Sequence, residues 1–94
     1  MKFYKLNEGG AKRDDGVVVQ IKHPDYLEYT EGDLSVDVSI GYDPSTRQIF
    51  VYASELTNWS RPTSVVPISD VKKQEIAQNL KEALGALKGK FVVS

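Results

Sequence analysis

The sequence predicts an α+β fold, in which an antiparallel meander β-sheet carries one long C-terminal α-helix across one face, followed by a short final strand. Short alternating or β-branched segments separated by turn residues follow one another through the first half of the chain. After Pro67 the apolar residues instead recur at spacings of three and four. A chain of 94 residues suits one hydrophobic core, so we expect a single domain over residues 1–94.

The first strands are predicted from short runs of apolar and aromatic residues. "KFYKL" near the N-terminus is a plausible first strand, and "VVVQIK" (17–22) and "YLEYT" (26–30) are two more. The charged, glycine-rich stretch "NEGGAKRDDG" (7–16) is expected to form a mobile loop. These segments should pair in sequence order.

The clearest strand signal is "LSVDVSIGY" (34–42), where Leu34, Val36, Val38 and Ile40 fall on one face. "QIFVYAS" (48–54) is β-branched and aromatic, and we expect it to pair with this strand. Between them, "DPST" is typical of a tight turn, with Pro44 in the first central position and the Asp43 carboxylate bonding turn amides.

The C-terminal helix is predicted to begin after Ser69, a favourable N-cap, and to run for about twenty residues. Its apolar stripe, which should face the sheet, comprises Ile76, Leu80, Ala83, Leu84 and Leu87. Gly89 is placed to end the helix, and "KFVVS" is a possible final strand.

The only tryptophan, Trp59, lies in the polar segment "ELTNWSRPTSVVPISD" (55–70), which links the last strand of the hairpin to the helix. We expect its indole to close the end of the core between sheet and helix, with an interface anchor as the alternative. Pro62 and Pro67 should stiffen the connection.

The residues that catalysis or metal binding would need are scarce. The chain has no cysteine, one histidine (His23, in a predicted turn), and no HExxH, GxxxxGK[ST] or GxGxxG motif. We therefore expect no enzyme, no cofactor, no metal site and no small-molecule substrate. The start "MKFYKLNEGG" has no continuous apolar run, and no apolar stretch could span a bilayer, so a cytoplasmic protein without membrane association is expected.

Charge is unevenly distributed along the chain. Residues 23–46 hold six acidic residues and no lysine or arginine, whereas residues 72–90 hold five lysines and two glutamates. An acidic region would repel phosphate, so nucleic-acid binding is not expected. The acidic segment is expected to bind a cationic partner, although a simple solvated face is the other interpretation. The predicted contact residues are Asp25, Glu28, Glu31, Asp33, Asp37, Asp43 and Tyr42.

Other tyrosines near this segment, Tyr26, Tyr29 and Tyr52, would add aromatic contact area, although a single tyrosine in a strand is more often a partly buried packing residue. Reversing Glu31, Asp33 and Asp37 to lysine is expected to leave the fold intact, because none lies on an apolar stripe.

The order of the later segments resembles a family of bacterial immunity proteins from polymorphic-toxin and contact-dependent growth-inhibition systems. The resemblance spans about residues 34–94 and consists of "QIFVYASEL", then "WSRP", then "PIS" opening the helix "EIAQNLKEALGAL", then a short closing strand. It implies a small cytoplasmic antidote that neutralises one cognate toxin domain by direct binding. Many such toxins are nucleases with basic grooves, so a basic partner is expected.

Two other functions remain open at this stage. One is a non-catalytic adaptor or accessory subunit of a larger bacterial assembly. The other is a small enzyme or ligand binder with a pocket between sheet and helix, for which the sequence offers no convergent polar groups.

Overall fold

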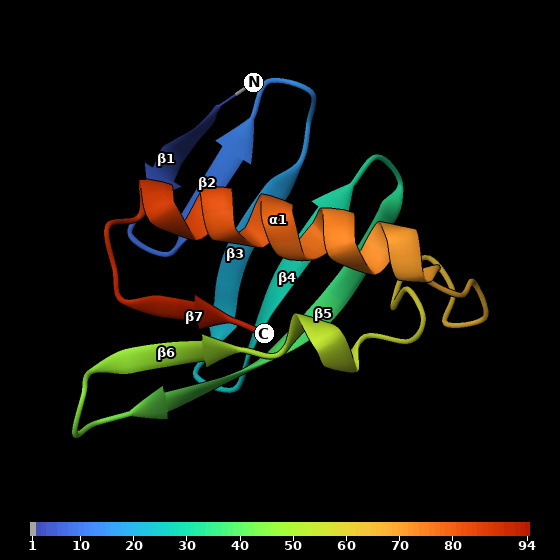
Figure 1. The fold of residues 1–94 in the computed structure, drawn as a ribbon. Coiled ribbons are helices and arrows are strands. Elements are labelled where there is room, and N and C mark those ends of the chain that lie inside the picture. The colour runs from blue at the N-terminus through green and yellow to red at the C-terminus, as the bar shows by residue number, and fades with distance from the viewer. Residues whose placement is uncertain (1) are drawn as a thin grey trace.

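The computed structural model describes residues 2–94 and shows a seven-stranded sheet with one α-helix across it (Figure 1). The strands lie side by side in sequence order, antiparallel except for the last pair, which confirms the predicted α+β fold. The strands are β1 (Phe3–Asn7), β2 (Gly10–Arg13), β3 (Val18–His23), β4 (Tyr26–Glu31), β5 (Leu34–Asp43), β6 (Gln48–Val51) and β7 (Phe91–Val93).

The long strand β5 makes the sheet curl. Its first part, Leu34–Ser39, pairs with β4, and its second part, Ile40–Asp43, pairs with β6. Because each part of β5 has a different neighbour, β6 and β7 turn away from the plane of the first strands. Figure 1 shows β2 to β4 crossing behind the helix, whereas β6 and β7 run alongside it.

The helix α1 (Asp70–Ala86) begins where the sequence predicts. The Ser69 hydroxyl accepts a hydrogen bond from the Lys72 amide at 3.1 Å, as an N-cap should. Four members of the predicted apolar stripe are buried, namely Ile76, Leu80, Ala83 and Leu84, and Leu87 is half-buried. The helical register derived from the sequence is therefore confirmed.

The helix ends earlier than expected, and Gly89 is not the residue that ends it. Lys88 takes the left-handed conformation after the last turn, with φ of 58°. Gly89 has another role, because a Cβ at this position would collide with the ring of Phe91. The helix α1 connects β6 to β7 and returns the chain to the end of the sheet where β6 begins. The strand β7 therefore pairs parallel to β6.

The expected mobile loop over residues 7–16 is wrong, because four of its residues form β2. Ala11 pairs with Val19 and is fully buried, while Gly10 leaves room for the side chain of Gln20 above it. Glycine and charge favour a loop locally, but pairing with β3 and burial of Ala11 outweigh that preference. Turns remain on either side of β2.

Trp59 lies in the core, as expected. Its side chain is 3% exposed, and its ring stacks on that of Tyr29 with centroids 6.3 Å apart. The Trp59 amide donates to the Val66 carbonyl at 2.9 Å, and the Ile68 amide donates to the Thr57 carbonyl at 2.8 Å. The segment from Thr57 to Ile68, called the 57–68 loop below, is thus a narrow ribbon with a buried base.

A chain of hydrogen bonds runs beneath the helix. The buried side-chain amide of Asn79 accepts from Arg13 at 3.1 Å and donates to the Tyr29 hydroxyl at 2.9 Å. That hydroxyl donates to Glu31 at 3.0 Å, and Lys72 of the helix donates to the same carboxylate at 2.9 Å. Burial raises the pKa of Tyr29 well above its ordinary value, so the phenol stays protonated as a donor.

Candidate partner-binding surface

The structure separates the acidic residues that the sequence places in one segment. Glu31 and Asp33 lie at the β4–β5 turn, whereas Asp43 lies at the far end of β5, ten residues long. At a rise of about 3.3 Å per residue, the two ends of β5 are about 30 Å apart. Asp25 lies at the β3–β4 turn, where its carbonyl accepts from the Ile40 amide at 2.9 Å. These residues do not form one continuous acidic patch.

The alternation of side chains along β4 and β5 also divides the predicted contact residues between the two faces of the sheet. Glu28 and Asp37 are directly opposed on β4 and β5, on the outer face that points away from α1. Glu31 lies on the face towards the helix, where it reaches Lys72. Tyr42 pairs with Ile49 on that same side, beyond the helix, and is 60% exposed.

The carboxylates of the strands are not uncompensated, which corrects the expectation from the local charge count. Arg61 Nη2 lies 2.7 Å from Glu28 Oε2 and 2.6 Å from Asp37 Oδ1. Lys72 Nζ lies 2.9 Å from a carboxylate oxygen of both Glu31 and Glu75. Residues 23–46 contain no lysine or arginine, but the fold brings cations to them from the 57–68 loop and from α1.

These ion pairs also change the proton affinity of the cations. Hydrogen bonding to Asp37 raises the pKa of Arg61, and hydrogen bonding to Glu31 raises the pKa of Lys72. Both side chains are therefore firmly charged. No feature of the local sequence marks Arg61 or Lys72 as partners of the strand carboxylates, because 24 to 41 residues separate them.

Three predicted acidic residues lie in or next to turns, Asp25 and Asp33 within them and Asp43 at the end of β5. The Asp43 carboxylate accepts from the Ser45 hydroxyl at 2.7 Å and the Ser45 amide at 3.0 Å, which lowers its pKa and confirms its expected turn role. The Asp25 side chain is 83% exposed and lies 3.6 Å from His23 Nδ1. Asp33 is exposed, and the described residues 2–94 offer it no ion pair.

The tyrosines occupy different environments. Tyr29 is fully buried, so the suggestion that it adds contact area is wrong. Tyr26 is 37% exposed and stacks on His23 with ring centroids 5.6 Å apart. Tyr52 is half-buried with its ring close to Gly41. Tyr26 and Tyr42 remain available to a partner.

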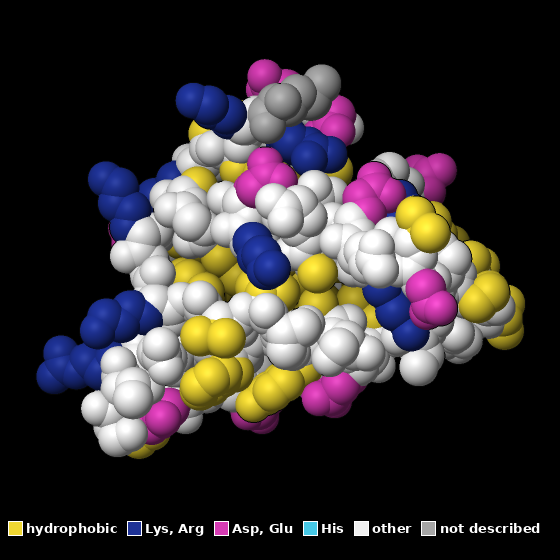
Figure 2. Space-filling model, viewed as in Figure 1, with side chains coloured by type: hydrophobic (Ala, Val, Ile, Leu, Met, Phe, Trp, Pro, Cys, Tyr) yellow, Lys and Arg dark blue, Asp and Glu magenta, His cyan; other side chains and the backbone are white. Residues whose placement is uncertain are grey.

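An exposed apolar surface, not anticipated from the sequence, lies where the 57–68 loop meets α1. Val65 and Val71 are each 75% exposed and Val66 is 36% exposed. The signal in the sequence is the stretch "SVVPISDV", where valines follow one another without the spacing of either a helix or a strand. Figure 2 shows hydrophobic side chains at this end of the molecule, beside acidic ones.

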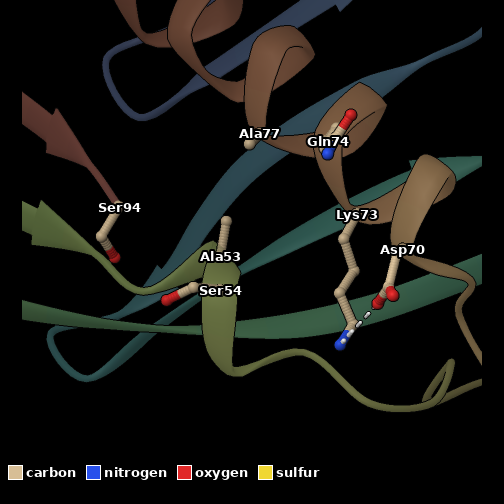
Figure 3. Close-up of a pocket in the computed structure, with 7 residues that line it drawn as sticks. All are labelled: Ala53, Ser54, Asp70, Lys73, Gln74, Ala77 and Ser94. Carbon is tan, nitrogen blue, oxygen red and sulfur yellow. Dashed lines mark ion pairs between the residues drawn. The ribbon is translucent and has the colours of Figure 1, made fainter.

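A cavity of about 460 Å³ opens between α1, the 3-10 turn Ala53–Glu55 and the end of β7 (Figure 3). Its charged side chains are Asp70 and Lys73, which pair at 3.8 Å. Its lining residues are Ala53, Ser54, Asp70, Lys73, Gln74, Ala77 and Ser94. Within residues 2–94, no group of three or more acidic or histidine side chains could hold a metal ion.

Comparison of the chain with protein-family models, with curated proteins and with solved structures gave no match. The described helix lacks the length and apolar character needed to cross a membrane.

Glu31 ties the β4–β5 turn to the helix, so we expect its replacement to destabilise the fold. Glu31→Ala removes the acceptor of both Tyr29 and Lys72, and we expect a loss of about 1–2 kcal/mol in the free energy of unfolding, reduced by partial exposure. Urea denaturation measures it. The matched control is Asp33→Ala, two residues along, which should stay within about 0.5 kcal/mol. Equal effects of the two variants would contradict the hydrogen-bonded chain described above.

Proposed function

We propose that this protein is a non-catalytic cytoplasmic antidote that binds a basic bacterial toxin domain, of nuclease type, and neutralises it by direct contact. The observation that carries the proposal is the set of exposed charged and tyrosine side chains on and around the β4–β5 hairpin. Tyr26 and Asp37 reach solvent on strands that pack on the core, and Asp25 and Asp33 reach it from the turns next to these strands.

The resemblance to immunity proteins over about residues 34–94 supports the same class. The segments that carry it occupy structural positions that suit a stable scaffold: Trp59 in the core, Ser69 at the helix N-cap and Leu80 against the sheet. The ion pairs of Arg61 and Lys72 reduce the acidic field that the sequence suggests. Electrostatic steering therefore rests mainly on carboxylates in the turns, and tight binding must come from other contacts.

The alternative function, an adaptor or accessory subunit, is favoured by the edge strand β1. Tyr4 and Leu6 of this strand are 45% and 47% exposed, and among the described residues 2–94 β1 pairs with β2 alone. An uncovered apolar edge strand is a common site of permanent pairing with another chain. A stable complex through β1 with a protein that is not toxic would favour this alternative.

The experiment is co-expression of this chain with the tagged C-terminal domain encoded by the gene directly upstream, followed by co-purification and a test of cell survival. We expect a stoichiometric complex and survival only when both chains are present. A toxic domain that kills equally in the presence of this chain would contradict the antidote function.

Charge-reversal variants test the steering. Asp25→Lys with Asp33→Lys removes two carboxylates that lie in turns, away from the close Arg61 and Lys72 pairs, so folding should be unaffected. We expect association to slow by about tenfold and to become less sensitive to salt. The matched control, Lys81→Glu with Lys88→Glu, reverses two exposed charges of the helix region and should leave binding unchanged. If the control slows association and the acidic variant does not, the partner is acidic.

A further inference from the structure

We propose that the partner is anchored on the exposed valines beside the start of α1, a surface formed by Val65, Val66 and Val71 and called the valine surface below. This inference rests on the proposed function, because it assumes a basic protein partner. It assigns that partner a particular shape: an apolar recess that receives the valines, rimmed by basic side chains.

The valine surface is held rigidly, as an anchor must be. The 57–68 loop is fixed at its base by two buried side chains, Trp59 at 3% and Ile68 at 5% exposure. Its tip is fixed as well, because the Asn58 side-chain amide donates to the Ser64 carbonyl at 2.7 Å. A preorganised apolar group loses little conformational entropy when it is buried by a partner.

Exposure of these valines has no explanation within the described chain. Val65 and Val71 are each 75% exposed, more than any other large apolar residue among residues 2–94. Grouped exposed apolar side chains at the end of a small protein mark an interaction site more often than scattered ones do. Figure 2 shows yellow side chains gathered at this end of the molecule.

The rim of the valine surface is acidic. The β4–β5 turn is brought to the first turn of α1 by the pair between Lys72 and Glu31, and the loop reaches β5 through the Ser35 amide, which donates to the Arg61 carbonyl at 3.1 Å. The β4–β5 turn and the first two turns of α1 contribute four carboxylates against two lysines, a net charge of −2, while Arg61 of the loop is paired with Glu28 and Asp37 on the outer face. The charged residues are Glu31, Asp33, Asp70, Glu75, Lys72 and Lys73.

Two of these carboxylates, Asp70 and Glu75, are more exposed than the lysines of the rim, whereas Glu31 is 26% exposed. The side chains of Asp70 and Glu75 are 96% and 51% exposed, whereas those of Lys72 and Lys73 are 31% and 30% exposed. An incoming protein therefore meets negative charge around an apolar centre. That pattern complements a basic rim around an apolar recess, and it disfavours a second copy of this chain, whose own rim would repel it.

The test compares a double variant of the valine surface with a control variant in the co-purified complex with the tagged upstream-encoded domain. Val65→Ser with Val71→Ser removes the apolar centre, and we expect dissociation to become at least tenfold faster. The control Val92→Ser removes an exposed apolar side chain elsewhere, and dissociation should stay within twofold of the parent protein. Thermal unfolding of each free variant confirms that the fold is retained.

Amide hydrogen exchange provides a second readout. Protection gained on binding should concentrate in residues 57–75 and the β4–β5 turn. If the parent chain binds the domain but the valine variant dissociates at the parental rate, or protection lies elsewhere, this inference is overturned while the antidote function stands. If the parent chain does not bind the upstream-encoded domain at all, the proposed function itself fails, and with it the assumption on which this inference depends.

Discussion

Trp59→Ala is expected to lower the free energy of unfolding by about 3–5 kcal/mol, the usual cost of removing a large buried aromatic side chain. The indole is 3% exposed and stacks on Tyr29, so its loss leaves a cavity between β4 and the base of the 57–68 loop. Stability in a domain of this size is small, so most of the stabilisation of the folded state would be lost. Urea or thermal denaturation followed by tyrosine fluorescence or circular dichroism measures the change.

The matched control is Tyr42→Ala, which removes an aromatic side chain that is 60% exposed. It should change stability by no more than about 0.5 kcal/mol. An unfolding midpoint unaltered by Trp59→Ala, combined with lost partner binding, would instead make Trp59 an interface residue.

Leu80→Ala should cost about 2–5 kcal/mol, because Leu80 is fully buried between α1 and the sheet. The range reflects how far the neighbouring side chains, among them Ile76 and Leu84, can close the cavity. The free energy of unfolding falls linearly with denaturant concentration. If the slope of this line is unchanged in the variant, the loss is one of stability and not a change in the compactness of the unfolded state.

Lys81→Ala, at the next position, is the control for Leu80→Ala. Lys81 is exposed, and alanine is the better helix former, so the change should stay within about 0.5 kcal/mol. Similar losses at both positions would contradict the burial of this helix face.

The core variants Trp59→Ala and Leu80→Ala affect function through stability alone. Tests of binding therefore use surface residues. The valines at 65 and 71 and the carboxylates of the turns can be changed without opening the core. Glu31 differs from Asp33 in this respect, although both are acidic and lie in the same turn region. Its carboxylate accepts from Tyr29 and Lys72, so the expectation that reversing Glu31, Asp33 and Asp37 together leaves the fold intact does not hold for Glu31. Asp37 is similarly tied to Arg61.

The sequence by itself determined the elements whose signal is local. Alternation from Leu34 to Ile40 predicts a strand buried on one side, and the spacing of Ile76, Leu80 and Leu84 predicts which face of the helix is buried. Each follows from the period of one element, 2 or 3.6 residues, and needs no knowledge of its neighbours. The turn at Asp43 and the cap at Ser69 are local hydrogen bonds and were predictable for the same reason.

Only the tertiary structure decided which residues meet. β2 forms because Ala11 is buried against β3, which outweighs the glycine and charge around it. The acidic segment is divided because β5 is a long strand, and it is partly neutralised because Arg61 and Lys72 arrive from distant elements. The exposed valines likewise result from how the 57–68 loop folds back on itself, with Trp59 and not Val65 turned inwards. Contacts between distant segments depend on packing and pairing that local periodicity does not encode, and the candidate binding surface consists largely of such contacts.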